Sequence, residues 1–270
     1  MSCRAPDPDS LRYARYWEPV LAEPAQRTLE RIAPVPGVFL DLGAGTGSLS
    51  LAAAARWPSA SIVALDASAG MLSVARQRVA DEGYDPSRFR WLPADAADIP
   101  LGDTSIEAVA SSFMLQLVDD RPAVLAGVRR VLRPGGTFAF VTWLSEELEL
   151  PADEVFIEVL DALEIEDPVD EPAFRSPRAG DYSSLEQARE ELDAAGFSEV
   201  EVGLEELRHR WTAHSYLAYK EDYDERDLFD SLEAGTRERL RAELRTRLAA
   251  LPPSALELRG PLVAAVARLP

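Results

Sequence analysis

The chain has 270 residues, 47% of them hydrophobic, and its 28 basic and 47 acidic side chains give a formal net charge of −19 at pH 7. This composition supplies a large hydrophobic core and excludes disordered and fibrous proteins. The negative charge repels phosphate backbones and acidic membrane surfaces, so we expect small-molecule partners and neither nucleic acid nor a membrane.

Cysteine content and hydropathy narrow the setting further. Cys3 is the only cysteine, so we expect no disulfide framework, no thiolate cluster and no bound metal. No segment approaches the roughly 18 to 20 consecutive apolar residues that span a bilayer, and no apolar targeting segment follows the N-terminus. The sequence therefore predicts a cytoplasmic protein.

Short apolar runs alternate with amphipathic helical stretches over the first half of the chain. Repeated strand, helix and strand with apolar strands predict a parallel sheet covered on both faces, and right-handed crossovers make it doubly wound. A first helix carries Tyr13, Tyr16 and Trp17, which we expect to pack against the sheet. The expected strands are 38–42, 62–65, 89–92, 106–110 and 137–143, and the expected helices between them are 47–56, 68–82 and 120–132.

The second half is more acidic and less regular. Residues 1–144 have a net charge of −2, whereas 145–270 have −17, and the segment 146–171 holds 12 acidic and no basic side chains. The alternation of apolar residues slips after Leu204, which predicts a bulge or the end of a strand there. The expected elements are helices near 155–163 and 184–195, a strand from 200, a charged helical stretch over 214–251 and a last strand over 262–269.

The clearest motif is a strand that runs into a glycine-rich turn and opens a helix, at 38–48. Glycines in such a turn let a ligand approach the backbone closely. A nicotinamide or flavin dinucleotide site is the obvious rival, but the third glycine of its fingerprint falls at Ser48. Asp41, just before the turn, would oppose a pyrophosphate and favour a cationic ligand. Asp66, at the end of the second strand, can accept hydrogen bonds from both hydroxyls of a ribose, which a dinucleotide and a cationic nucleoside would both require.

A cationic nucleoside with a ribose points to S-adenosylmethionine, and the ordered motifs support that choice. The chain resembles the class I S-adenosylmethionine-dependent methyltransferases of the broad type 11 group, which includes quinone-biosynthesis and malonyl-carrier methyltransferases. The resemblance covers residues 36–144. The matching motifs are DLGAGTG at 41–47, ALDAS at 64–68, PADA at 93–96, ASSFMLQLVD at 110–119 and VLRPGGT at 131–137.

The resemblance implies a role for each motif in binding the cofactor. The loop after the first strand would hold the methionine portion, the end of the second strand the ribose, and the residues after the third strand the adenine. Carbonyls after the fourth strand would meet the ammonium group, and a glutamine lies there whose role is open. The implied binding residues are Asp41, Gly43, Ala44, Gly45, Gly47, Asp66, Ala67, Met71, Asp95, Ala96, Ser111, Ser112 and Gln116.

The resemblance also implies the fold and the reaction. We expect one methyltransferase domain over 1–270 with a seven-stranded, mostly parallel Rossmann-like sheet, a cofactor-binding core at 36–144, and helical cap insertions at 145–183 and 213–252. The reaction is methyl transfer to a small-molecule acceptor by in-line displacement. A non-catalytic S-adenosylmethionine-binding module and a nicotinamide-dependent oxidoreductase stay open as alternatives. The acceptor, the methylated atom, the catalytic residues and the oligomeric state are not predicted.

Two features outside the motifs carry weaker expectations. His209 and His214 are the only histidines, and we expect packing or surface roles for them, not that of an indispensable general base. The carboxylates of 146–171 are either a solvated acidic face or the source of a negative field that attracts amine acceptors to the pocket.

Overall fold

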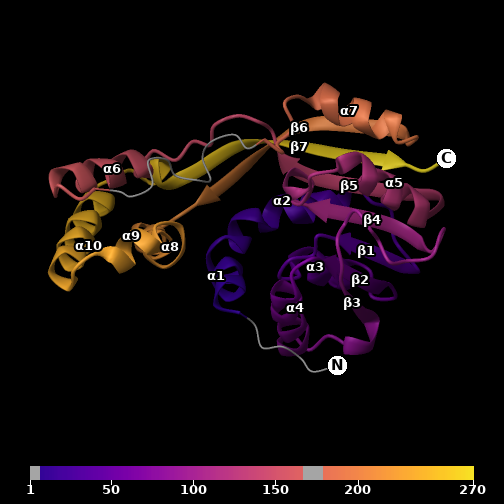
Figure 1. The fold of residues 1–270 in the computed structure, drawn as a ribbon, viewed down its shortest axis with the longest axis horizontal. Coiled ribbons are helices and arrows are strands. Elements are labelled where there is room, and N and C mark those ends of the chain that lie inside the picture. The colour runs from indigo at the N-terminus through magenta and orange to yellow at the C-terminus, as the bar shows by residue number, and fades with distance from the viewer. Residues whose placement is uncertain (1–6, 167–178) are drawn as a thin grey trace. The chain divides into compact units, whose positions relative to one another are not determined.

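The computed structural model describes residues 7–166 and 179–270 (Figure 1). The chain divides into two compact units. The part of the acidic segment and of the first predicted insertion that falls at 167–178 lies outside the described residues. The first unit consists of Met1–Ser145, Arg178–Glu205 and Leu262–Pro270, and the second of Glu146–Pro177 and Glu206–Pro261.

The first unit is built on a sheet with the strand order β3-β2-β1-β4-β5-β7-β6 (Figure 1). Strands β1 to β5 pair in parallel, and β7 runs antiparallel to β5. The prediction of a seven-stranded, mostly parallel sheet is therefore confirmed. The strands are β1 Val38–Leu42, β2 Ser61–Asp66, β3 Phe89–Pro93, β4 Ile106–Ser112, β5 Leu132–Trp143, β6 Ser198–Arg210 and β7 Glu257–Arg268.

Both faces of the sheet are buried, as the continuous apolar strands require. Neighbouring residues of β1 point to opposite faces: Phe39 packs in one apolar cluster with Leu29 and Trp57, and Leu40 packs in another with Leu125. The helices of this unit that contribute to these clusters are α2 Glu18–Glu30, α3 Ser48–Arg56, α4 Ala69–Asp81, α5 Arg121–Val131 and α7 Leu185–Ala194, and α1 Pro8–Tyr16 precedes them in the chain.

Side-chain caps fix where several of these helices begin. Ser68 accepts from the backbone N–H of Met71 before α4, and Asp120 accepts from that of Ala123 before α5. Each cap satisfies a donor that the first helical turn leaves open. Helix α3 instead starts directly after Gly47, whose φ of 89° ends the glycine loop.

Strands β5 and β7 begin earlier than the sequence predicts, and β6 continues past the slip in its apolar pattern. β5 begins at Leu132 and not at the predicted 137, so residues 133–136 of the VLRPGGT motif lie inside it, where the register of pairing with β4 shifts. Of the two outcomes expected at the slip after Leu204, the end of the strand is excluded: β6 continues to Arg210, and its buried side changes, with Leu204 62% exposed and Leu207 fully buried. β7 starts five residues before the predicted 262.

The second unit is mainly helical. The predicted continuous stretch at 214–251 is interrupted by a π-helical turn, Lys220–Asp224, and by a further break after Ser231. Among the described residues, no helix is long and apolar enough to cross a membrane. The helices of this unit are α6 Ala152–Ala162, α8 Ala213–Tyr219, α9 Arg226–Ser231 and α10 Ala234–Ala249.

A buried ion cluster lies within the second unit. Lys220 is 1% exposed, and its Nζ lies 3.1 Å from Asp153 Oδ1 and 2.5 Å from Asp224 Oδ2. Asp153 also accepts from the hydroxyl of Tyr216. Asp153 is therefore a buried, neutralised partner and not a member of the solvated acidic face that composition alone suggested.

Candidate functional site

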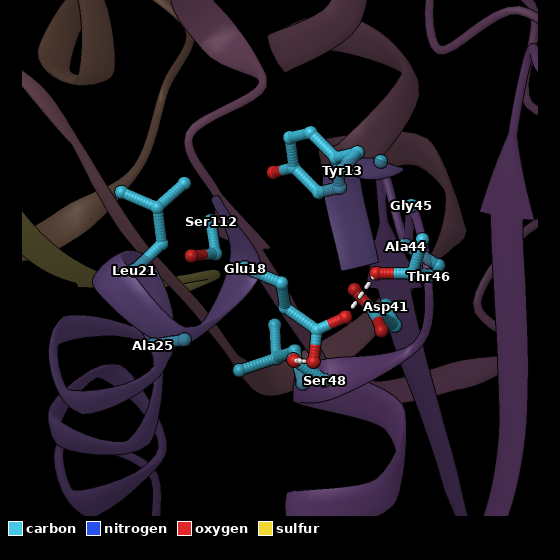
Figure 2. Close-up of a pocket in the computed structure, with 12 residues that line it drawn as sticks. Tyr13, Glu18, Leu21, Ala25, Asp41, Ala44, Gly45, Thr46, Ser48 and Ser112 are labelled. Atoms are coloured by element: carbon cyan, nitrogen blue, oxygen red, sulfur yellow. Dashed lines mark hydrogen bonds between the residues drawn. The ribbon is translucent and has the colours of Figure 1, made fainter. Parts of the chain in front are cut away.

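A pocket opens in the first unit at the carboxyl ends of β1 and β4 (Figure 2). Parallel strands place their carboxyl ends at one edge of a sheet, and ligands of open α/β sheets bind at that edge. None of the described side chains that line the pocket is basic. The lining residues are Tyr13, Glu18, Leu21, Ala25, Asp41, Gly43, Ala44, Gly45, Thr46, Ser48, Leu49 and Ser112.

The three glycines of the loop have different reasons to be glycine. All have positive φ, namely 78° at Gly43, 52° at Gly45 and 89° at Gly47. A Cβ on Gly43 would lie 2.4 Å from the Met114 side chain, and one on Gly47 would lie 2.8 Å from Ala75 Cβ. A Cβ on Gly45 would meet no atom within 4 Å. Gly43 and Gly47 thus allow close packing, whereas Gly45 leaves its backbone open toward the pocket.

Asp41 supplies a buried carboxylate to the pocket. It is 1% exposed, and its Oδ2 accepts from the Ser50 hydroxyl at 2.6 Å. Burial raises the pKa of Asp41 to about 7, the nearby charge of Asp66 adds to this, and the bond from Ser50 opposes it. A ligand with a positive charge would stabilise the ionised form of this carboxylate.

Asp66 joins the end of β2 to the glycine loop. Its Oδ2 accepts from the backbone N–H of Gly45 at 2.8 Å, and its Oδ1 accepts from that of Ser68 at 2.8 Å. Burial raises the pKa of Asp66, and both backbone bonds oppose that shift. Asp66 does not line the pocket of Figure 2, but it is bonded to Gly45, which does.

The residues predicted to contact adenine follow β2 and β3. Ala67 is exposed, and Met71 is half-buried in the first turn of α4. Asp95 is exposed and accepts from the Ala97 N–H at 2.8 Å, the arrangement of an Asx turn. Ala96 is buried in the apolar cluster beneath the sheet. These four positions belong to the same sheet edge as the glycine loop but do not line the pocket.

The residues predicted after β4 are divided between pocket and interior. Ser112 lines the pocket, whereas Ser111 is 1% exposed and its hydroxyl has no hydrogen-bond partner among the described residues. Gln116 is buried, and its side chain donates to the Phe113 carbonyl at 2.7 Å and accepts from the Thr142 hydroxyl at 2.5 Å. Gln116 therefore ties the loop after β4 to β5.

The first two helices contribute pocket residues that the sequence did not reveal. Tyr13, expected to pack against the sheet, lines the pocket, and so does Glu18, which was not singled out. Glu18 is 8% exposed and accepts from the hydroxyls of Thr46 and Ser48. Trp17-Glu18-Pro19 has the pattern of an ordinary helix start, so no local signal marked its acid as inward-facing.

Both histidines belong to the second unit. The ring centroids of His209 and Trp211 are 4.4 Å apart, and burial lowers the pKa of His209. His214 is exposed at the start of α8. Neither lines the pocket of the first unit. Within 7–166 and 179–270, no group of three or more His, Cys, Asp or Glu side chains is arranged to hold a metal ion.

The sheet topology and the glycine loop after β1 define the class: residues 39–136 match the family described as "Methyltransferase domain". The resemblance derived from the motifs is therefore confirmed over this segment. The chain is 41% identical over 118 residues to the malonyl-[acyl-carrier protein] O-methyltransferase of Xylella fastidiosa. This alignment covers 42% of this chain and 39% of that protein. It is 40% identical over 103 residues to the ubiquinone/menaquinone biosynthesis C-methyltransferase UbiE of Desulfotalea psychrophila, covering 38% and 40%.

A solved structure extends the likeness of fold over nearly the whole chain. The phosphoethanolamine N-methyltransferase 2 of Haemonchus contortus, determined with S-adenosylhomocysteine, superposes with a TM-score of 0.55 at 19% identity. The alignment covers 97% of this chain and 57% of that one. The matches to the two curated relatives span only about two fifths of those proteins. The matched core therefore leaves the acceptor undefined.

Proposed function

We propose that the protein transfers the methyl group of S-adenosylmethionine to a small-molecule acceptor by in-line displacement. The observation that carries the proposal is the pairing of a buried carboxylate with an open backbone: Asp41 lines the pocket beside Gly45, whose missing side chain leaves free space. A carboxylate of this kind favours a cationic ligand and opposes a pyrophosphate. The pocket therefore suits a sulfonium nucleoside better than a nicotinamide dinucleotide.

The proposed binding mode follows the strand ends in order. The glycine loop and Asp41 hold the methionine portion, and Asp66 accepts from the ribose hydroxyls with the lone pairs that its two backbone bonds leave. Backbone atoms after β4 face the ammonium group. The residues of this proposed site are Asp41, Gly43, Ala44, Gly45, Gly47, Asp66, Ala67, Met71, Asp95, Ala96, Ser111, Ser112 and Gln116.

The chemistry asks little of the chain beyond binding. When bound, the cofactor supplies a methyl group on a sulfonium, which is a good leaving group. The protein then holds the acceptor atom within about 3 to 3.5 Å of that methyl group and excludes water. We assign no catalytic residue, and the two histidines are not required as general bases.

The acceptor is proposed only as a class. The two relatives bear the names of an O-methyltransferase acting on a carrier-bound malonyl group and a C-methyltransferase of quinone biosynthesis, so the shared core is compatible with different acceptors. We propose that the insertions at 145–183 and 213–252 cap the substrate pocket, since the first follows the carboxyl end of β5 directly. A cytoplasmic location and the absence of nucleic-acid partners belong to the same proposal.

Calorimetry with the full chain tests the proposal. S-adenosylmethionine and S-adenosylhomocysteine are each titrated in parallel with NAD⁺, NADH and NADPH. We expect the two adenosyl ligands to bind at one site and the nicotinamide cofactors not to bind. Binding of a nicotinamide cofactor alone would instead support the oxidoreductase.

Turnover separates the enzyme from a binding module. The protein is incubated with S-adenosylmethionine and a panel of carboxylic acids, phenols, hydroquinones and amines, and formation of S-adenosylhomocysteine is measured. An enzyme produces it in the presence of at least one acceptor. Tight cofactor binding with no product across the whole panel would support the non-catalytic module.

A further inference from the structure

Glu18 lies at the start of α2 and connects three elements of the first unit. Its carboxylate accepts from the hydroxyls of Thr46 and Ser48, on either side of Gly47 in the glycine loop (Figure 2). It also accepts from Arg78 Nη1 of α4 at 2.5 Å. The same Arg78 nitrogen donates to the Thr46 carbonyl at 2.9 Å. One buried acid thus joins α2, the loop and α4.

The contacts of Glu18 bear on the shape of the loop at the pocket. Thr46 directly follows Gly45, whose N–H is bonded to Asp66 and whose open side faces the pocket. Fixing the hydroxyl and the carbonyl of Thr46 limits the backbone rotations available to Gly45. A glycine has wide conformational freedom, so a loop of this kind needs such restraints to keep one shape.

The same contacts hold the first two helices against the pocket. Tyr13 of α1 and Leu21 of α2 line it together with Glu18 (Figure 2). Asp7 is the N-cap residue of α1, and its Oδ2 lies only 1.7 Å from the position that a Cβ on Gly70 would occupy. The N-terminal end of α1 therefore also packs closely on the start of α4. The helices α1 and α2 therefore form one wall of the pocket, and Glu18 fastens that wall to the loop.

We propose that Glu18 is a positioning residue for the cofactor: through Thr46, Ser48 and Arg78 it holds the glycine loop in its binding shape and keeps α1 and α2 closed beside the ligand. The inference rests on the proposed function. It assigns Glu18 a role in the affinity and residence time of the cofactor, without direct contact with the reacting atoms.

A matched pair of variants tests the role. Glu18→Ala removes all three contacts of the carboxylate. Glu205→Ala removes another acid that pairs with α2, through Arg27 and Arg31, away from the loop. When only side-chain atoms are counted, Glu18 is 11% exposed and Glu205 is 15% exposed, so the two acids are similarly buried. A general loosening of α2 would affect both variants, whereas a loss of loop positioning affects only the first.

The readout is the binding of S-adenosylhomocysteine, by calorimetry for Kd and by stopped-flow tryptophan fluorescence for the dissociation rate. We expect Glu18→Ala to raise Kd about tenfold or more, mainly through faster dissociation, as the loss of a charge-assisted bond allows. Glu205→Ala should change Kd less than about twofold, because Glu205 contacts neither the glycine loop nor the pocket lining and distant sites act independently. Glu18→Gln keeps an acceptor oxygen for a hydroxyl and should recover part of the affinity.

A second set of variants keeps the positioning role testable if the first variant is unstable. If Glu18→Ala does not fold, Glu18→Gln is compared with Arg78→Met and the double variant, whose effects on Kd should not add because both act on one contact. Additive effects, an unchanged Kd, or equal losses in the Glu18 and Glu205 variants overturn the positioning role. A wild-type protein that does not bind S-adenosylhomocysteine overturns the proposed function itself, and the inference with it.

Discussion

The two units of the chain bury acidic side chains in different surroundings. In the first unit Asp41 is buried at a pocket whose described lining has no basic residue. In the second unit Asp153 is equally buried but pairs with Lys220, the only lysine of the chain, within a closed cluster. Burial of a carboxylate is therefore not by itself a sign of a ligand site. What distinguishes the two cases is whether open space or a protein cation lies beside the acid.

The two units also differ in the sequence features that stabilise them. The first unit follows the rules of a parallel sheet, with apolar strands and capped helices. The second holds most of the negative charge and is fixed in part by ion pairs. Variants that exchange or remove these charges should therefore affect stability in one unit and ligand binding in the other.

The largest expected effect is on stability, in the second unit. Lys220→Met leaves Asp153 without its cation, and breaking a buried pair on one side costs about 3 to 5 kcal/mol. Urea denaturation followed by circular dichroism measures the loss. Replacing both partners, in Asp153→Asn with Lys220→Met, should be less damaging than the single change. A single variant as stable as wild type would show that the cluster contributes little.

The next effect is on binding, in the first unit. Asp66→Ala should weaken cofactor binding by about 1.5 to 3 kcal/mol, the size of a lost charge-assisted hydrogen bond, while the protein stays folded. Calorimetry with S-adenosylhomocysteine measures Kd, and thermal unfolding checks the fold. Unchanged affinity would remove Asp66 from the site and leave it only the bond to the glycine loop.

A smaller effect concerns pH and Asp41. Since the pKa of Asp41 in the folded protein is about 7, a cationic ligand that needs the ionised form should bind about tenfold more tightly at pH 8 than at pH 6. Asp41→Asn should remove this dependence. Calorimetry in buffers of different ionisation enthalpy should also detect a proton released on binding near pH 7. Affinity that falls as pH rises would contradict the assignment.

The raised pKa of Asp41 also determines whether its contribution to folding stability rises or falls with pH. Folded Asp41 keeps its proton up to about pH 7, whereas the unfolded chain releases it near the ordinary value of 3.8. The folded state thus binds more protons between these values, so the contribution of Asp41 to stability declines as pH rises through that window. Comparing wild type with Asp41→Asn in urea at pH 5 and pH 8 isolates it. A difference that grows in the opposite direction would contradict burial as the cause.

The smallest effect is expected at an exposed acid on the same helix as Asp153. Glu158 pairs with Arg247 at 2.8 Å, but the two side chains are 63% and 40% exposed. Such pairs contribute about 0 to 1 kcal/mol, so Glu158→Gln should leave the urea midpoint nearly unchanged. A loss comparable to that of Lys220→Met would show that exposure does not separate Glu158 from Asp153.

Local patterns were enough to predict the sheet and the glycine loop. The strand β1 and the helix after Gly47 depend on neighbouring residues, and the ordered motifs gave the family. Glu18 was missed because its partners lie 28, 30 and 60 residues away in the chain. Asp153 was grouped with the other carboxylates of 146–171, as part of a solvated face or of a negative field, because composition counts charges without showing which way a side chain points.

The discontinuity of the units has a consequence for any shortened version of this protein. A fragment that ends at Ser145 keeps β1 to β5 but loses α7, β6 and β7, because these elements come later in the chain. In the intact sheet β7 covers β5 along seven paired residues, from Thr137 to Trp143. Without it, β5 becomes an open edge with unpaired backbone groups and a strongly apolar sequence. Such an edge recruits other chains, so the truncated protein should aggregate even though it retains every motif of the cofactor site.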